Sequence, residues 1–322
     1  MTRPATPSPD AATALPLPLP NTPSHPTSAQ AAAAPPEVKP TAPARNGTAS
    51  LVTATSATAA TPSAVLRADD LSLAHGQAIA VNAVRLALPP GRLTAVVGPN
   101  GCGKSTLLAG LSRLHRPAGG AVSLDGRDLA RLPAREAARR VGLLPQSALA
   151  PDGLTVADLV RFGRQPHQGL LRQWSPQDQQ AVDRALGATG MTALAGRPLE
   201  TLSGGQRQRA WIAMTVAQET AVMLLDEPTS ALDLGHQLEV LELLRELAAA
   251  GRTVVIVVHD LMLACRYADH LVAMKAGRVV AEGAPREIVT PELIRRLYGV
   301  EADVLRDPGS DRPLVVPRGL AP

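Results

Sequence analysis

The pattern of hydrophobic and polar positions becomes regular at about residue 63. From there, two stretches alternate apolar with more polar residues, as half-buried strands do: Leu71 and Leu73, then Val84, Leu86 and Leu88. Runs of mainly apolar residues at 93–97, 222–225 and 253–258 indicate fully buried strands. The intervening sequence predicts helices at 104–114 and 235–250. Strands that alternate with helices favour a mainly parallel sheet covered by helices on both faces.

The remaining periodic segments complete this pattern. Residues 121–124 are typical of a strand that ends in a turn, and residues 151–214 are mostly helical in pattern. Strands at 271–275 and 279–282 predict a closing hairpin, and a last pair of strands flanks Asp307-Pro308-Gly309. The predicted fold class is therefore α/β.

The first 62 residues differ in composition from the rest of the chain. They hold 13 of the 30 prolines, are otherwise dominated by Ala, Thr and Ser, and show no sustained apolar periodicity. Such a segment cannot bury enough apolar surface to offset its ordering entropy. We predict disorder for this extension. A partner-binding role is the alternative, and no motif supports it.

Composition and charge narrow the function classes. Aromatic residues make up only 2% of the chain, so the core is aliphatic and few rings are available to stack on nucleic-acid bases. The net charge of +4 comes mostly from arginines scattered among acidic residues, which disfavours a nucleic-acid partner. No apolar run approaches the ~20 residues of a membrane span, and the N-terminus lacks the apolar stretch of a secretory signal. Two cysteines, Cys102 and Cys265, suit a reducing compartment.

A glycine-rich motif lies between the predicted strand at 93–97 and the helix that follows. It reads Gly98-Pro99-Asn100-Gly101-Cys102-Gly103-Lys104-Ser105 and continues into Thr106. Glycines let backbone N–H groups curl round a β-phosphate, and the helix N-terminus adds a favourable field. We expect Lys104 to reach the β- and γ-phosphates of ATP and Ser105 to place its hydroxyl on Mg²⁺. A chance match in a glycine-rich turn is the alternative, which the strand-to-helix context disfavours.

Acidic residues follow the next buried strand of the predicted sheet. Asp226 and Glu227 stand at its carboxyl end, where parallel sheets bind ligands. We expect Asp226 to hold Mg²⁺, usually through water, and Glu227 to orient or deprotonate the attacking water. His259 ends the following strand at the same edge, placed to hydrogen-bond the γ-phosphate. A helix cap is the alternative for the two acids, and a complete phosphate loop disfavours it. A structural role is the alternative for His259, and its place at the end of a strand next to the Asp226 strand disfavours it.

One short segment points to a single family of phosphate-loop proteins. It reads Leu202-Ser203-Gly204-Gly205-Gln206, in which Ser203 is a good helix N-cap and the glycines leave the helix start open to an anion. The segment resembles the signature of ABC-type ATPases and stands 20 residues before Asp226, as in that family. The resemblance implies that the signature of one subunit completes the ATP site of another, in a head-to-tail homodimer.

Further marks of that family follow in order. Gln146 matches the residue that senses the γ-phosphate and contacts Mg²⁺, and Asp233 ends the segment 230–233 that crosses the dimer interface. The adenine ring commonly stacks on a Tyr or Trp, and His75 stands at that place here, where it would stack more weakly. The resemblance covers roughly residues 66–317.

The resemblance also implies an architecture. We expect a P-loop NTPase core, in which helices flank a mainly parallel sheet, joined by an antiparallel β subdomain and an α-helical signature subdomain. The disordered extension is assigned to 1–62 and the ABC ATPase domain to 63–318. Within that domain the helical subdomain spans about 147–215, and a tail follows at 319–322.

A closer likeness is to the ATPases of ferric siderophore importers, particularly the ferric enterobactin type. The shared segments are 161–167 with Trp174, 206–213, 235–237, 264–268 and 313–317. This likeness implies an ATP-hydrolysing subunit held peripherally at the cytoplasmic face of the inner membrane. Its implied partners are integral permease subunits and, through the complex, a periplasmic or lipid-anchored substrate-binding protein.

Two alternatives to siderophore import stay open at this point. Related importers carry haem, cobalamin or other metal chelates, and their ATPases never touch the cargo. A soluble ABC-type ATPase acting on DNA or ribosomes is disfavoured, because the chain has one ATPase unit and no sustained heptads.

The segment from Gln146 to Trp174 leads from the phosphate-sensing residue into the helical region. In importers of this family that region faces the permease, so it supplies the predicted permease contacts, which are Arg161, Arg164, His167 and Trp174. Packing of Phe162 and Trp174 inside the helical subdomain is the alternative.

Overall fold

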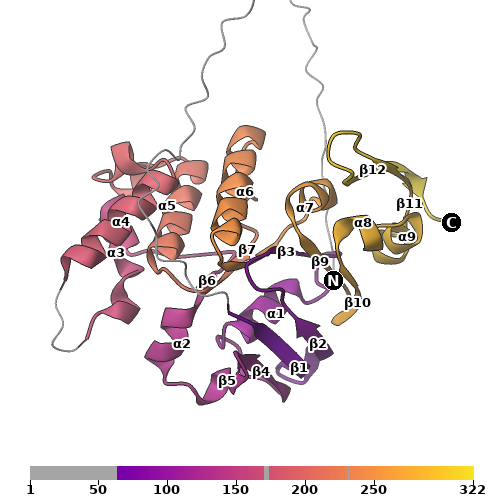
Figure 1. The fold of residues 1–322 in the computed structure, drawn as a ribbon, viewed down its shortest axis with the longest axis horizontal. Helices are drawn as coiled ribbons and strands as arrows, with labels where there is room; N and C mark the ends of the chain where they lie inside the picture. The colour runs from indigo at the N-terminus through magenta and orange to yellow at the C-terminus, as the bar shows by residue number, and fades with distance from the viewer. Residues whose placement is uncertain (1–63, 170–173, 231) are drawn as a thin grey trace, which may run out of the picture. The chain divides into compact units, whose positions relative to one another are not determined.

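The computed structural model of this chain describes residues 64–169, 174–230 and 232–322. The disorder predicted for residues 1–62 therefore lies outside the described residues. Figure 1 shows the arrangement of the helices and strands.

A six-stranded sheet lies at the centre of the fold, with strand order β10-β9-β3-β8-β7-β6. The strands are β3 (Leu93–Val97), β6 (Val141–Leu144), β7 (Val222–Asp226), β8 (Thr253–Val257), β9 (His270–Lys275) and β10 (Arg278–Gly283). Neighbouring strands pair in parallel, except for the antiparallel hairpin of β9 and β10. The predicted mainly parallel sheet and its closing hairpin are confirmed.

Side chains of the central strands alternate between two hydrophobic cores, one on each face of the sheet. Val96 and Leu224 belong to one core, and Ala95 and Leu225 belong to the other. The main covering helices are α1 (Lys104–Leu111) on the first face and α5 (Gly204–Ala217), α6 (Leu234–Ala249) and α7 (Leu261–Tyr267) on the second. Figure 1 shows these helices on opposite sides of the sheet. Burial on both faces explains the mainly apolar runs in the sequence.

An antiparallel sheet lies over the first core, in the order β2-β1-β4-β5. Its strands are β1 (Leu66–His75), β2 (Ala78–Ala87), β4 (Gly119–Leu124) and β5 (Arg127–Asp128). The 3-10 helix η1 (Leu129–Arg131) and helix α2 (Ala134–Arg140) lead from it to β6. This sheet places His75, the last residue of β1, beside the start of α1, because His75 Nε2 lies 3.2 Å from Thr106 Oγ1.

A helical region separates β6 from β7. It consists of α3 (Val156–Phe162), η2 (Gln165–His167), α4 (Pro176–Ala188), η3 (Thr192–Leu194), η4 (Leu199–Thr201) and α5. Each of its three α-helices starts at a capping box, in which an N-cap side chain and the N3 side chain satisfy each other's backbone N–H groups. The mostly helical pattern of this region is confirmed, and α5 extends two residues beyond the predicted end of the subdomain.

The chain ends in two short helices and a two-stranded sheet. These are α8 (Pro285–Ile288), α9 (Pro291–Tyr298), β11 (Val300–Arg306) and β12 (Pro313–Leu320). The strand pair flanks Asp307-Pro308-Gly309 as predicted, and β12 reaches two residues into the predicted tail. None of the described helices is both long and apolar enough to span a lipid bilayer.

Candidate nucleotide-binding site

A cavity of about 460 Å³ opens where the first turn of α1 meets the carboxyl ends of β7 and β8. Its lining residues come from segments that are far apart in the sequence: His75, Ala80, Asn100, Gly101, Gly103, Lys104, Ser105, Thr106, Gln146, Glu227 and His259. All of these except Ala80 were predicted site residues. The fold therefore brings the phosphate loop, Gln146 and the two strand-end residues into one site.

The glycine-rich loop is pressed between two strands. Gly98 has φ +147°, and a Cβ at this position would lie 2.1 Å from the Met274 carbonyl oxygen of β9. Gly103 has φ +102°, and its Cβ would lie 2.5 Å from the Ala80 carbonyl oxygen of β2. Any side chain would force the loop away from both strands, so these two glycines fix its position.

Lys104 is nearly buried, with 5% of its surface exposed. Its Nζ atom donates hydrogen bonds to the carbonyl oxygens of Gly98, at 2.9 Å, and Pro99, at 3.0 Å. Both acceptors are neutral, so they orient the ammonium group without cancelling its charge. A desolvated cation at the mouth of the cavity attracts a polyanion such as a triphosphate.

Three predicted nucleotide contacts have other roles in the loop, and these are Gly98, Pro99 and Cys102. The first two present the carbonyl groups that hold Lys104. The Cys102 side chain is buried in the core beside α1 and does not line the cavity. Burial raises the pKa of its thiol, against the nearby Lys104 charge, which lowers it.

Glu227 is held on both of its carboxylate oxygens. Gln146 Nε2 donates a hydrogen bond to Oε2 at 2.8 Å, and His259 Nε2 lies 2.5 Å from Oε1. The backbone of Glu227 has φ +51°, in the left-handed region that residues other than glycine seldom adopt. Such backbone strain often occurs at functional sites. The carboxylate therefore has a fixed position at the wall of the cavity.

Asp226 ends β7, is buried and does not line the cavity. Among the residues that the structure describes, none is a hydrogen-bond partner of its Oδ1 atom. Burial raises the pKa of the Asp226 carboxyl, and the nearby Ser105 hydroxyl opposes that effect. An unpartnered carboxylate oxygen beside a hydroxyl is a hard-oxygen donor set, the kind that Mg²⁺ prefers. These residues therefore fit a magnesium ion.

His75 lies at the rim of the cavity. Besides its contact with Thr106, its ring packs edge-to-face against His115, with 4.9 Å between the ring centroids. His115 is itself fixed, because its Nε2 atom donates to the Ala74 carbonyl oxygen at 2.9 Å. The imidazole of His75 is thus held in place rather than free to rotate.

The predicted signature residues lie outside this cavity. The Ser203 hydroxyl accepts the Gln206 backbone N–H at 3.3 Å, and Gln206 Oε1 accepts the Ser203 N–H at 3.2 Å. Asp233 caps α6 by accepting the His236 backbone N–H. None of the residues Ser203, Gly204, Gly205, Gln206 and Asp233 lines the cavity. Within one chain, the predicted nucleotide contacts therefore fall into separate groups.

The prediction that Arg164 contacts the permease is wrong, because its side chain is buried. Arg164 is only 5% exposed, because its guanidinium is held by two carboxylates and a backbone carbonyl within the helical region. His167 is partly buried and donates to the Gln218 carbonyl oxygen at 2.8 Å. By contrast, Phe162 and Trp174 are 40% and 39% exposed.

Sequence reasoning also missed the partners of Arg164, which are Asp178 and Glu219. A signal for Asp178 was present, because Ser175-Pro176-Gln177-Asp178 is a capping-box pattern. For Glu219 the sequence offers no comparable signal, since the partner lies 55 residues from Arg164.

Comparisons with family models, with related sequences and with solved structures all point to one family. The ABC transporter family pattern matches residues 81–230. The ferric enterobactin transport ATP-binding protein FepC of Escherichia coli (strain K12) is 53% identical over 255 residues, covering 79% of this chain and 94% of that protein.

Two solved structures are similar over most of their length. A metal-chelate type ABC transporter in an inward-facing conformation matches with a TM-score of 0.68 and 32% identity, covering 80% of this chain and 98% of that chain. A dimeric bacterial ABC transporter cassette matches with a TM-score of 0.62 and 26% identity, covering 68% of this chain and 98% of that one. The phosphate loop, the strand-end carboxylates and these likenesses agree: this chain belongs to the ABC transporter family, among its ATP-binding and ATP-hydrolysing proteins.

Proposed function

We propose that this chain is the ATP-hydrolysing subunit of an importer that carries ferric siderophores across the cytoplasmic membrane. It would work at the cytoplasmic face, bound to integral permease subunits that receive cargo from a periplasmic or lipid-anchored binding protein. The observation that carries this proposal is the 53% identity with a ferric enterobactin transport ATPase over nearly the whole of that protein.

A broader metal-chelate cargo, such as haem or cobalamin, is the second candidate. It is favoured by the likeness to a metal-chelate type transporter, which is 32% identical. The siderophore relative is more similar to this chain, so we propose ferric siderophore first.

The phosphate loop would bind the triphosphate of ATP. Lys104 would contact the β- and γ-phosphates, and the backbone N–H groups at the start of α1 would hold the β-phosphate. His75 at the cavity rim would stack on the adenine ring. The ammonium group of Lys104 is already oriented by two carbonyl oxygens, which supports this role.

Glu227 would act on the attacking water. Its carboxylate is fixed by Gln146 and His259, so it can accept a proton from a water, or orient one, without first rotating. When ATP is bound, His259 would donate its N–H to the γ-phosphate in place of Glu227, and Gln146 would still hold the carboxylate. Ser105, Asp226 and the amide oxygen of Gln146 would hold Mg²⁺, which when bound neutralises charge on the phosphates.

A second copy of the chain would complete each ATP site. The signature residues at the start of α5 and Asp233 at the start of α6 lie outside the cavity, and Ser203 and Asp233 are exposed. In a head-to-tail homodimer, these residues of one copy would face the ATP bound by the other. The likeness to a dimeric cassette supports this arrangement.

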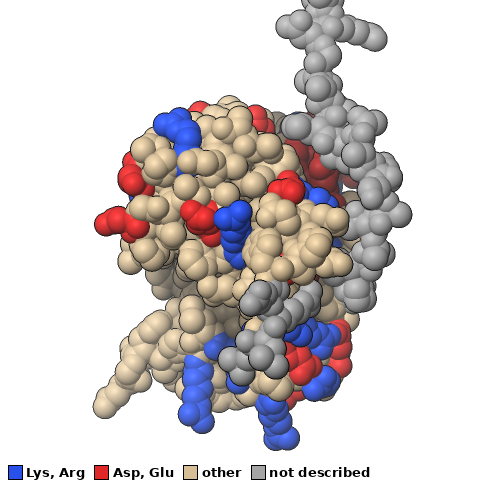
Figure 2. Space-filling view, turned by 90° about the vertical axis from the view of Figure 1, so that its left-hand side faces the viewer, with Lys and Arg blue, Asp and Glu red and all other residues tan. Residues whose placement is uncertain are grey.

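The exposed helical region would face the permease. Arg161 lies with its guanidinium 5.7 Å from the centre of the Trp174 ring, and Phe162 is exposed beside it. On this side of the molecule, basic and acidic side chains are interspersed among uncharged ones (Figure 2). An exposed arginine–aromatic pair in a surface of mixed charge supports a protein partner rather than a polyanion.

Uptake by cells tests the proposed cargo. In a strain that lacks only this chain, we expect uptake of radiolabelled ferric siderophore to be lost. The wild-type chain should restore it and Glu227→Gln should not. Uptake of siderophore iron that is unaffected, together with lost uptake of haem or cobalamin, would instead assign the chain to the second candidate.

A further inference from the structure

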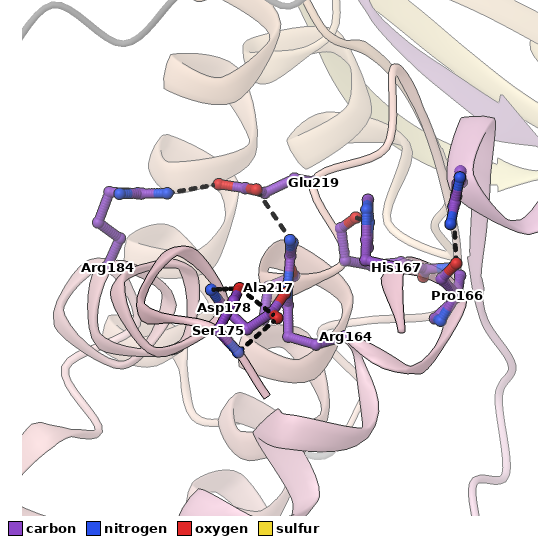
Figure 3. Close-up of polar contacts among 10 residues, drawn as sticks. Arg164, Pro166, His167, Ser175, Asp178, Arg184, Ala217 and Glu219 are labelled. Atoms are coloured by element: carbon purple, nitrogen blue, oxygen red, sulfur yellow. Dashed lines mark hydrogen bonds and ion pairs between the residues drawn. The ribbon is translucent and has the colours of Figure 1, made fainter. Parts of the chain in front are cut away.

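Arg164 joins the ends of three helices at a buried point in the helical region. Figure 3 shows its guanidinium directed between α4 and the end of α5. Nε of Arg164 lies 3.1 Å from Oδ1 of Asp178, which is 0% exposed. Asp178 is also the capping-box residue of α4, because its Oδ2 accepts the Ser175 backbone N–H at 3.1 Å. The pair therefore fixes the end of α3 to the start of α4.

A second nitrogen of the guanidinium holds the connector between α5 and β7, which consists of residues 218–221. Nη1 of Arg164 donates to the Ala217 carbonyl oxygen at 2.7 Å and to Glu219 Oε2 at 3.0 Å. Glu219 has φ +52°, so the connector is in a conformation that needs support from its surroundings. Arg184 of α4 holds the second oxygen of Glu219 from the surface side, at 2.7 Å.

The same connector is bonded through Gln218 to α2, the helix that precedes β6. Nε2 of Gln218 donates to the Ala138 carbonyl oxygen of α2 at 2.7 Å, and the Gln218 carbonyl oxygen accepts from His167. Arg139 of α2 donates to the Pro166 carbonyl oxygen at 2.7 Å. The segment that follows α3 is thus bonded both to the connector and to α2.

The connector joins the helix that begins at the signature to the strand that leads to Glu227. Helix α5 starts at the signature residue Ser203, and β7 ends at Asp226, directly before Glu227. Gly163 lies so close to α5 that a Cβ there would be 2.2 Å from the Met214 carbonyl oxygen. The end of α3 and the helix behind the signature therefore have to move together.

The contacts of residue 164 require the planar guanidinium of an arginine. Burial alone would raise the pKa of Asp178, but hydrogen bonds from Ser175 and Arg164 outweigh it and hold that pKa below its ordinary value. The planar guanidinium meets Asp178 with one nitrogen and the connector with another. A lysine keeps the charge but cannot reproduce this fork.

We propose that Arg164 is a positioning residue for ATP hydrolysis: it fixes the angle between the signature helix α5 and the strand β7 that leads to Glu227. Through that angle it sets how one copy presents its signature to the ATP held by the other. This inference rests on the proposed two-copy site. Arg161 and Phe162 are exposed one turn earlier in the chain, so Arg164 lies next to the proposed permease face.

The first experiment measures ATP-dependent dimerisation in the Glu227→Gln background, with size-exclusion chromatography at several protein concentrations. Adding Arg164→Lys should weaken the ATP-bound dimer about tenfold or more, because small displacements of a positioned group have effects on the order of tenfold to a hundredfold. MgATP affinity, measured by calorimetry below the dimerising concentration, should stay within about twofold, because Arg164 does not line the cavity. The matched control is Arg184→Gln, which removes only the exposed bond to Glu219. Because exposed ion pairs contribute little to stability, this variant should leave the dimer unchanged.

The second experiment measures steady-state hydrolysis with Glu227 intact. Arg164→Lys should lower kcat and leave the KM for ATP nearly unchanged, and Glu219→Gln, a milder change at a partly exposed site, should lower kcat less. A folded Arg164→Lys protein with the dimerisation and kcat of Arg184→Gln would overturn the inference. If Arg164→Lys does not fold, an unaltered kcat in Glu219→Gln overturns it instead. Failure of Glu227→Gln alone to dimerise with ATP would reject the two-copy function, and the inference with it.

Discussion

The Oε1 atom of Glu227 lies 2.5 Å from the Nε2 atom of His259, while its other oxygen accepts a hydrogen bond from Gln146. The three residues follow three adjacent strands of the central sheet, β7, β8 and β6. Adjacent strand ends thus hold one carboxylate from both sides. Restricted rotation of this kind is what orienting a water for attack requires.

Glu227→Gln tests that carboxylate directly. The amide keeps the size of the side chain but cannot accept a proton from water, so we expect MgATP binding to persist. Hydrolysis should fall by about two to four orders of magnitude, the usual contribution of general-base catalysis. Phosphate release from the purified chain with its permease is the measurement. Near-normal turnover would reject Glu227 as the essential group.

Lys104→Ala should fail at an earlier step, the binding of the nucleotide. A hydrogen bond to a charged group contributes about 1.5–3 kcal/mol, so loss of the loop's ammonium should weaken MgATP binding by roughly tenfold or more. Calorimetric titration gives the affinity. Lys275→Ala is the matched control, because that lysine is exposed and bonds to the Arg296 carbonyl oxygen away from the cavity. Equal affinities in the two variants would contradict the role of Lys104.

His75→Tyr should strengthen ATP binding. A larger ring stacks better on adenine, and aromatic pairs contribute about 0.5–1.5 kcal/mol, so the Kd should fall by roughly threefold. GTP and ATP titrations with wild type, His75→Tyr and His75→Ala give the comparison. If all three proteins bind ATP equally, the base does not stack on residue 75.

His167 gives a prediction for the pH dependence of stability. Its pKa lies below the ordinary value, mainly because burial disfavours the imidazolium; the bond to the Gln218 carbonyl raises it, and Arg164 and Arg139 lower it further. The unfolded chain therefore takes up the proton first as the pH falls below about 6.5. Stability should decline from there towards the folded-state pKa and then level off.

The test compares denaturation midpoints of wild type and His167→Gln at pH 7.5 and 5.5. The amide of Gln can still donate a hydrogen bond but takes up no proton in this range, so the variant should lose less stability. Part of the decline should remain, because burial also lowers the pKa of His270. Equal losses in both proteins would assign the decline to other groups.

Local sequence predicted most of the fold and most of the residues that line the cavity. The phosphate loop has a glycine wherever the backbone needs one, and the acids follow an apolar run, so Lys104 and Asp226 are readable from spacing alone. The order of the strands in the central sheet also places Gln146, Glu227 and His259 at one edge, as expected for parallel strands.

Side-chain contacts between residues far apart in the chain could not be predicted from local sequence patterns. Arg164 looks like a surface arginine until its partners Asp178 and Glu219, 14 and 55 residues away, are in place. Cys102 stands in the phosphate loop, but its side chain points into the core, because a turn directs backbone and side chains to different sides. Such features depend on the packed fold rather than on the pattern of the sequence.

We propose above all that ATP hydrolysis by this chain drives ferric siderophore import. The most direct test uses proteoliposomes that hold the permease subunits with this chain, ATP on the side of the chain, and binding protein loaded with radiolabelled ferric siderophore on the other. Iron accumulation and phosphate release are measured together. We expect iron to accumulate only with ATP and intact Glu227, and loaded binding protein to stimulate phosphate release. Iron accumulation of equal rate with Glu227→Gln, or none while haem or cobalamin is taken up, would contradict the proposal.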